Sequence, residues 1–143
     1  MYIGLKHLHS TLAWVFIIVM VIAIIYFTIA ILSKKDFTKW SKRLGLAGLI
    51  LAHLQLLIGL ILYFVSPMGF SNLGGDAMKD SFQRLLVIEH PFINIIAIIL
   101  ITIGYRLAKK APTDYGKHLK LQIFYVIGLG LILLRIPWQV WPV

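Results

Sequence analysis

The sequence predicts an all-α membrane protein, an antiparallel bundle of four transmembrane helices that forms a single domain over residues 1–143. Hydrophobic residues make up 60% of the chain and charged residues only 13%, whereas about 25% of the residues of a soluble domain are charged. Four apolar stretches have about the ~20 residues that a helix needs to cross a bilayer. They are Thr11–Leu32, Leu44–Val65, Leu85–Leu107 and Leu119–Trp138. None shows the polar stripe of a soluble core helix.

The net charge of +9 is concentrated in two loops between these stretches. The first loop holds Lys34, Lys35, Lys39, Lys42 and Arg43 against Asp36, and the third holds Arg106, Lys109, Lys110, Lys117 and Lys120 against Asp114. Basic loops stay on the cytoplasmic side, so we expect both termini and the middle loop to face outward (N-out, C-out). This placement argues against a nucleic-acid partner. It predicts a multi-pass protein in contact with membrane lipid, in the inner (cytoplasmic) membrane of a bacterium.

The segment before the third stretch contains turn signals and then a helical pattern. Pro67, Gly69 and Gly74 favour turns, and Met78–Glu89 has apolar residues at helical spacing. The pattern fits a short interfacial helix or an early start of the third span. Pro91 lacks the N–H that would bond to Val87 and fits either a kink or a place in the first helical turn.

Glycines and tryptophans in and near the spans indicate helix contacts and membrane interfaces. Glycines in the second and fourth stretches predict close approach of helices. They are Gly45, Gly48, Gly59, Gly128 and Gly130. Trp138 and Trp141 fit an aromatic belt at the outer membrane interface, and Trp40 fits the inner one.

Every apolar stretch has a histidine in it or at its start, and the chain has no cysteine. Ionisable side chains within a membrane usually face the bundle interior and mark function. Imidazole is also a common axial ligand of haem, and the missing thiols exclude thiolate ligation and iron–sulfur clusters. The histidines therefore predict haem b as the cofactor, with one haem expected and a second as an option.

His9 and His90 are the predicted iron ligands of an outer haem. A faint repeat places them at equivalent positions, each ahead of an apolar span that ends in two lysines, so they would lie on parallel, diagonal helices. At ~1.5 Å per residue, His90 lies roughly 28 Å from Lys109 and His9 roughly 37 Å from Lys34. Tilt of the first helix, or its protrusion into the cytoplasm, could absorb this mismatch, and His7 is a less well placed substitute for His9.

His53 and His118 are candidates for a second, inner haem. The alternative for His118 is a solvated residue at the inner interface. The alternative for His53 is a buried imidazole bonded to a neighbouring helix. In either case His53 is expected to face the bundle interior, because an unpartnered imidazole in lipid is costly.

Two arginines are candidates for pairing with the propionate groups of the haem. Arg135 and Arg84 carry guanidinium groups, which suit carboxylates, but both could instead extend to the outer interface. Glu89 could pair with either arginine or take part in proton movement. Asn94, one turn after His90, could bond an imidazole or a neighbouring helix.

The whole pattern resembles small bacterial four-helix membrane proteins labelled cytochrome B. The resemblance rests on the opening Tyr2–Ser10, the Ala52–Leu60 run and the Ile88-Glu89-His90 step. More distantly, His53, Gln55, Gly59 and the His90 span resemble one four-helix half of haem A synthase. In that family histidines on diagonal helices serve haem, but another residue, typically arginine, stands where this chain has Pro91.

These observations predict a membrane b-type cytochrome that transfers electrons through a bis-histidine haem near the outer side of the membrane. A quinol or a respiratory complex is the expected electron partner. Two alternatives stay open: a non-redox structural or assembly subunit of a membrane complex, whose histidines and glycines serve helix packing, and an enzyme of haem metabolism.

The loop charges make the orientation testable. In this cysteine-free chain, Lys39→Cys and Lys110→Cys should resist a membrane-impermeant maleimide in intact cells or spheroplasts and react after permeabilisation. Ser71→Cys, in the middle loop, is the matched control and should react without permeabilisation. Labelling of position 39 or 110 from outside would contradict the predicted orientation.

Overall fold

The computed structural model describes residues 1–142. Within them the chain is helical without a β-strand, and four helical segments are long and apolar enough to cross a membrane. These are α1 (Tyr2–Leu32), α2 (Lys39–Val65), the segment Ser81–Lys110 and α6 (Asp114–Leu134). The third comprises α4 (Ser81–Arg84), a π-helical turn η2 (Leu85–Glu89) and α5 (His90–Lys110). The four predicted apolar helices are thus confirmed.

Two helix boundaries differ from the prediction in ways that affect the site. Helix α1 begins at Tyr2 rather than Thr11, so His9 lies in its third turn instead of ahead of it. Helix α6 ends at Leu134 rather than Trp138. Pro137 accounts for this end, because proline has no N–H to donate and disfavours helical geometry at the residue before it.

Of the two alternatives predicted for Met78–Glu89, the structure shows the early start of the third span. A short 3₁₀ turn η1 (Phe70–Asn72) and a short helix α3 (Gly75–Lys79) follow the turn residues. The third spanning segment then starts early, at Ser81. Asp80 fixes this start, because its carboxylate accepts a hydrogen bond of 2.7 Å from the backbone N–H of Gln83, as an N-cap residue does.

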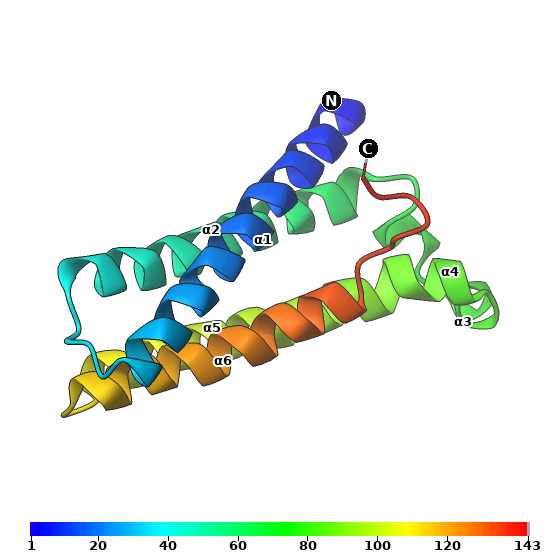
Figure 1. Cartoon of the computed structure of the whole chain (residues 1–143). Coiled ribbons are helices and arrows are strands. Elements are labelled where there is room, and N and C mark those ends of the chain that lie inside the picture. Colours follow the sequence, from blue (N-terminus) through cyan, green and yellow to red (C-terminus); the bar gives the residue numbers. More distant parts are fainter. Residues whose placement is uncertain (143) are drawn as a thin grey trace.

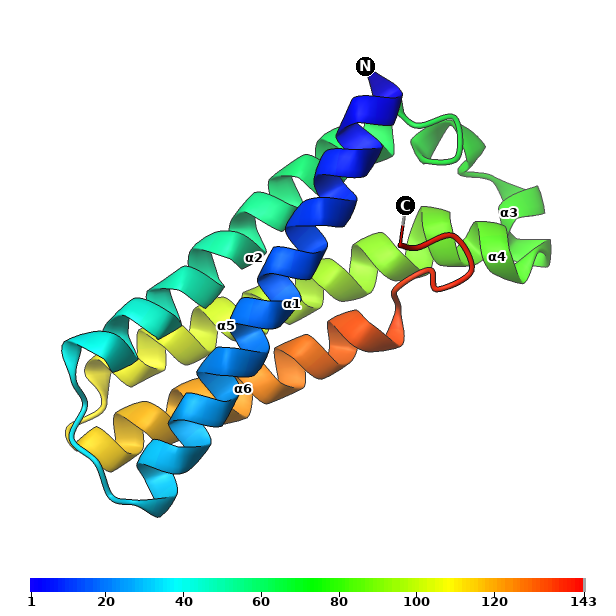
Figure 2. The same cartoon turned by 45° about the horizontal axis from the view of Figure 1, so that its top comes forward.

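The packing order of the helices places α1 and α5 on a diagonal. Helix α1 packs against α2 and α6, and α5 packs against the same two helices. The short linkers 33–38 and 111–113 lie at one end of the molecule, and the N-terminus, the C-terminal segment and α3 lie at the other (Figures 1 and 2). Toward this second end the α1–α2 pair diverges from the α5–α6 pair (Figure 2).

The end with the short linkers is closed by buried aromatic and polar side chains. The His118 ring lies 5.0 Å from that of Phe37 and 6.0 Å from that of Phe27. Its Nε2 is 2.9 Å from the Ser41 hydroxyl, which in turn bonds to the Tyr26 hydroxyl. This network joins α1, α2 and α6, so the helices are firmly packed here.

The glycines predicted to permit close helix approach do so at all but one position. A Cβ on Gly128 would lie 2.5 Å from Cγ1 of Ile101, and one on Gly48 would lie 2.9 Å from Sδ of Met20. Gly104, which the sequence analysis did not single out, lies against Phe124. Gly130 has open space beside it, so the prediction is wrong there because it faces away from the neighbouring helices.

Gly128 and Gly130 therefore form a matched pair on one helix. Gly128→Ala should lower the free energy of unfolding by about 1–3 kcal/mol through overpacking against Ile101. Gly130→Ala should be neutral, or stabilising by up to about 1 kcal/mol, because alanine favours a helix over glycine. Thermal unfolding in one detergent measures both, and equal effects would contradict this packing.

Candidate functional site

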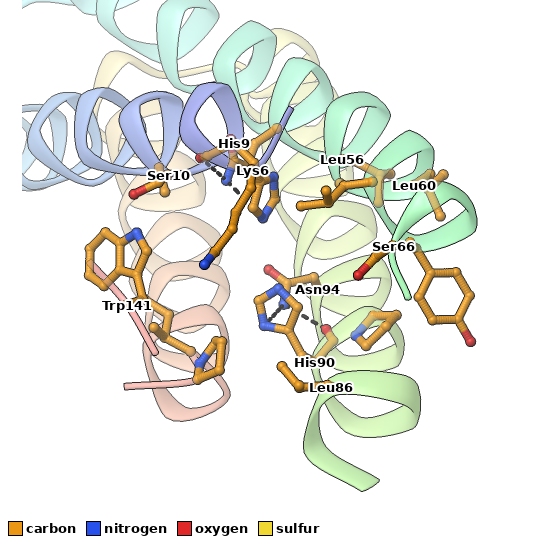
Figure 3. Close-up of a pocket in the computed structure, with 18 of the residues that line it drawn as sticks. Lys6, His9, Ser10, Leu56, Leu60, Ser66, Leu86, His90, Asn94 and Trp141 are labelled. Carbon is orange, nitrogen blue, oxygen red and sulfur yellow. Dashed lines mark hydrogen bonds between the residues drawn. The ribbon is translucent and has the colours of Figure 1, made fainter. Parts of the chain in front are cut away.

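A cavity of about 230 Å³ lies at the end where the helix pairs diverge. Side chains from α1, α2, α5 and α6 and from the C-terminal segment line it, and most are apolar. Trp141 covers part of it and is held there by stacking on Trp14, with ring centroids 4.6 Å apart. The polar groups that reach the cavity include His9, His90 and Asn94 (Figure 3).

The two predicted iron ligands, His9 and His90, face one another in this cavity. Their ring centroids are 6.3 Å apart and their ring planes are at 83° (Figure 3). His9 comes from α1 and His90 is the first residue of α5. The rings meet despite the expected depth mismatch because α1 is inclined to α5 and α6 (Figure 1).

Hydrogen bonds fix the orientation and the tautomer of His90. Its Nδ1 lies 2.7 Å from the backbone carbonyl of Arg135 at the end of α6. A carbonyl only accepts, so Nδ1 carries the proton and Nε2 keeps its lone pair. Nδ1–H bonding to a carbonyl is the usual outer contact of a metal-bound histidine. The Asn94 amide nitrogen lies 3.2 Å from the same Nδ1, a longer contact than that to the Arg135 carbonyl, and it donates to the His90 backbone carbonyl at 2.6 Å.

His9 is anchored less completely, and part of its ring has no partner. The Gln55 amide donates to the His9 backbone carbonyl at 3.0 Å and lies 3.4 Å from the ring Nε2. Nδ1 is buried and has no hydrogen-bond partner within residues 1–142. A Cβ on Gly59 would be 3.0 Å from Cε1 of His9, so the missing side chain makes room for the ring.

The π-helical turn that precedes His90 is stabilised from a neighbouring helix. Pro91 cannot donate to the carbonyl of Val87, and the Tyr63 hydroxyl of α2 donates to that carbonyl instead, at 2.9 Å. Pro91 occupies the first turn of α5, and the His90 N–H bonds to Leu85 across the π-helical turn. π-Helical turns occur often at functional sites. This one directly precedes His90 and so determines the position of its backbone at the start of α5.

Arg84 and Arg135 pair with Glu89 and do not line the cavity. Nε of Arg84 lies 2.9 Å from one Glu89 oxygen, and Nε of Arg135 lies 3.3 Å from the other. The predicted pairing of Glu89 with these arginines is confirmed. Neither arginine is among the described residues that line the cavity. Because Glu89 precedes His90, the two ion pairs tie the start of α5 to the end of α6.

His53 and His118 are not brought together. His118 bonds to Ser41, and His53 lies twelve residues further along α2, a rise of roughly 18 Å. The predicted inner haem pair is therefore not formed. His118 is 1% exposed, so a solvated interfacial position is also wrong, because the aromatic rings of the α1–α2 hairpin cover it.

The expectation that His53 faces the bundle interior is wrong as well. Its side chain is exposed at the α2–α5 surface. The ring still has partners, because Nδ1 lies 2.9 Å from the Leu49 carbonyl and Nε2 lies 3.4 Å from the Thr102 hydroxyl. These bonds remove the penalty on which the expectation rested.

Three residues line the cavity that were not predicted as site residues from the sequence: Lys6, Gln55 and Trp141. Lys6 precedes His9 by three residues and so shares its helix face, which was a usable signal. Gln55 is a polar residue inside an apolar helix, which also indicates an inward position. Trp141 lies beyond the last helix, and its place depends on how the chain turns back.

Comparison with protein families, curated proteins and solved structures gave no match to this chain. Among residues 1–142 there is also no cluster of three or more His, Cys, Asp or Glu side chains that could hold a bare metal ion. The distinctive chemical feature of the site is the pair of imidazoles in an apolar cavity.

The Glu89 ion pairs generate a stability prediction. Glu89→Gln should lower the free energy of unfolding by about 1–2 kcal/mol, because two partly buried charge-assisted bonds are weakened. Asp76→Asn is the control, since its pair with Lys79 is highly exposed and such pairs contribute about 0–1 kcal/mol. Thermal unfolding in detergent compares them, and a loss in Asp76→Asn as large as in Glu89→Gln would refute the role given to Glu89.

Proposed function

We propose that this protein is a membrane b-type cytochrome that binds one haem b between His9 and His90. The observation that carries the proposal is the opposed pair of imidazole rings, 6.3 Å apart. Two imidazoles that bind one metal ion from opposite sides have ring centres roughly 6 Å apart. Each metal–nitrogen bond is about 2 Å long, and each nitrogen lies about 1 Å from its ring centre.

The donor set also suits a metal that takes only two protein ligands. The proton of His90 is committed to the Arg135 carbonyl, which leaves Nε2 as a donor. The buried His9 ring has a nitrogen without a partner among the described residues. A flat apolar macrocycle would supply the remaining metal ligands, and the cavity around the rings is lined mainly by aliphatic and aromatic side chains.

Electron transfer is the activity that this site supports best. Haem b, when bound, supplies a reversible one-electron couple. Two histidine ligands leave no iron position open for substrate or oxygen. The chain's own part is to hold both rings, to exclude water with Trp141 and the apolar lining, and to set the basicity of His90 through the Arg135 carbonyl. A quinol or a respiratory complex remains the proposed electron partner.

The proposal includes an orientation in the membrane. We place the helices antiparallel in the inner membrane of a bacterium, with the basic linkers 33–38 and 111–113 in the cytoplasm. The cavity then lies near the outer side. One haem is proposed rather than two, because His53 and His118 are apart.

Haem retention by single variants tests the function. The purified protein should show a Soret band and a sharp reduced α-band, and pyridine haemochrome analysis should give one haem b per chain. His90→Ala and His9→Ala should each abolish haem retention, since one imidazole cannot hold a six-coordinate low-spin iron. His7→Ala and His53→Ala, which change exposed histidines, are the controls and should keep the haem.

The outcomes of this experiment distinguish failure of the proposed function from failure of the ligand assignment. Wild-type protein that binds no haem, even after haemin is added to the folded apoprotein, would overturn the function and favour a structural subunit. Full retention in His90→Ala would overturn the ligand assignment. Thermal unfolding of each apoprotein separates loss of a ligand from loss of the fold.

A further inference from the structure

The cavity has an uncompensated positive charge. Lys6 is the one lysine or arginine among its described lining residues, and no aspartate or glutamate lines it. Figure 3 shows the Lys6 side chain reaching from α1 past His9 into the space near His90 and Trp141. The amino group makes no ion pair within residues 1–142. Lys6 is half-buried, and an ammonium group held beside an apolar cavity attracts an anionic group of a ligand.

The basic residues that would compete for such a ligand are engaged elsewhere. Arg84 and Arg135 share the carboxylate of Glu89 and lie outside the cavity lining. A ligand carboxylate could recruit them only by breaking these two ion pairs. Lys6 needs no such exchange, and its flexible four-carbon stem lets the ammonium follow a carboxylate.

A second donor without an acceptor lies at the same cavity. Nε1 of Trp141 is buried and has no hydrogen-bond partner within the described chain. The indole N–H can only donate. Stacking on Trp14 and contact with Trp138 hold the ring in place. The cavity thus offers one ammonium and one indole N–H, both suited to carboxylate oxygens.

We propose that Lys6 binds a propionate carboxylate of the haem, with the Trp141 indole N–H as a second donor to the propionate edge. This rests on the proposed function, since it assigns residues of this chain to the acidic groups of that cofactor. It directs the polar edge of the macrocycle toward Lys6, and it replaces the arginines that the sequence suggested for this role.

Titration with two porphyrins tests the proposal. The full-length apoprotein in detergent is titrated with haemin, which carries two free carboxylates, and with haemin dimethyl ester, which carries none. The dissociation constant is read from the Soret band. Lys6→Gln should weaken haemin binding by roughly 10- to 100-fold, the effect of one lost hydrogen bond between charged groups, and should leave ester binding nearly unchanged.

Three further variants sharpen the test. Lys6→Arg should retain the preference of the wild type for the free acid, because the charge is kept. Trp141→Phe keeps a ring to stack on Trp14 and removes the N–H, so it should weaken haemin binding by a smaller factor. Lys79→Gln, an exposed lysine outside the cavity, is the control and should change neither porphyrin's affinity.

The possible failures are distinguishable. If the wild type binds neither porphyrin, the proposed function fails and this inference fails with it. If the wild type binds both with equal affinity and Lys6→Gln changes neither, the propionate assignment is overturned while the cytochrome stands. If Lys6→Gln weakens both porphyrins equally, Lys6 shapes the cavity and does not bind the carboxylate, which also overturns the assignment.

Discussion

The hydrogen bond from the His90 ring to the Arg135 carbonyl connects the site to the fold. A helix end leaves its last carbonyls without partners, and α6 ends just before Arg135 because Pro137 cannot extend it. One of these carbonyls accepts from His90 at the first residue of α5. The same arginine pairs through its side chain with Glu89. Where α6 stops therefore determines which imidazole nitrogen is available in the cavity.

The two ends of the bundle differ in how well their polar side chains are satisfied. At the closed end, His118, Ser41 and Tyr26 satisfy one another under aromatic cover. At the other end the helix pairs diverge around the cavity (Figure 2), and polar atoms of His9 and Trp141 stay without partners in the described chain. Buried unsatisfied groups cost about 1–3 kcal/mol each. A ligand that satisfied them would recover that cost and would stabilise the open end of the molecule.

The charged residues around the cavity fall into two groups, one in the framework and one in the cavity lining. Glu89 with its two arginines belongs to the framework that holds the start of α5, and it lies outside the lining. Lys6 lies inside the lining, where the proposed propionate would meet it. In the proposed function, this division suits a molecule that combines a large apolar body, a metal centre with two open positions and an acidic edge. Haem b, the proposed cofactor, is such a molecule.

The sequence by itself determined the number of apolar helices, because the length and hydropathy of each stretch are properties of the chain alone. It also indicated that His9 and His90 would meet, because both precede spans that run in the same direction.

Which way each side chain points was decided by the tertiary structure. Uniformly apolar helices carry no polar stripe to mark an inner face, so His53 was expected inside and is exposed, and Gly130 was expected at a contact and has none. His118 is buried because Phe27 of α1 and Phe37 of the α1–α2 linker lie against its ring, and Trp141 reaches the cavity because the chain turns back after Pro137. Those contacts join residues far apart in sequence. They depend on how the helices pack and on where the linker and the C-terminal segment lie against them.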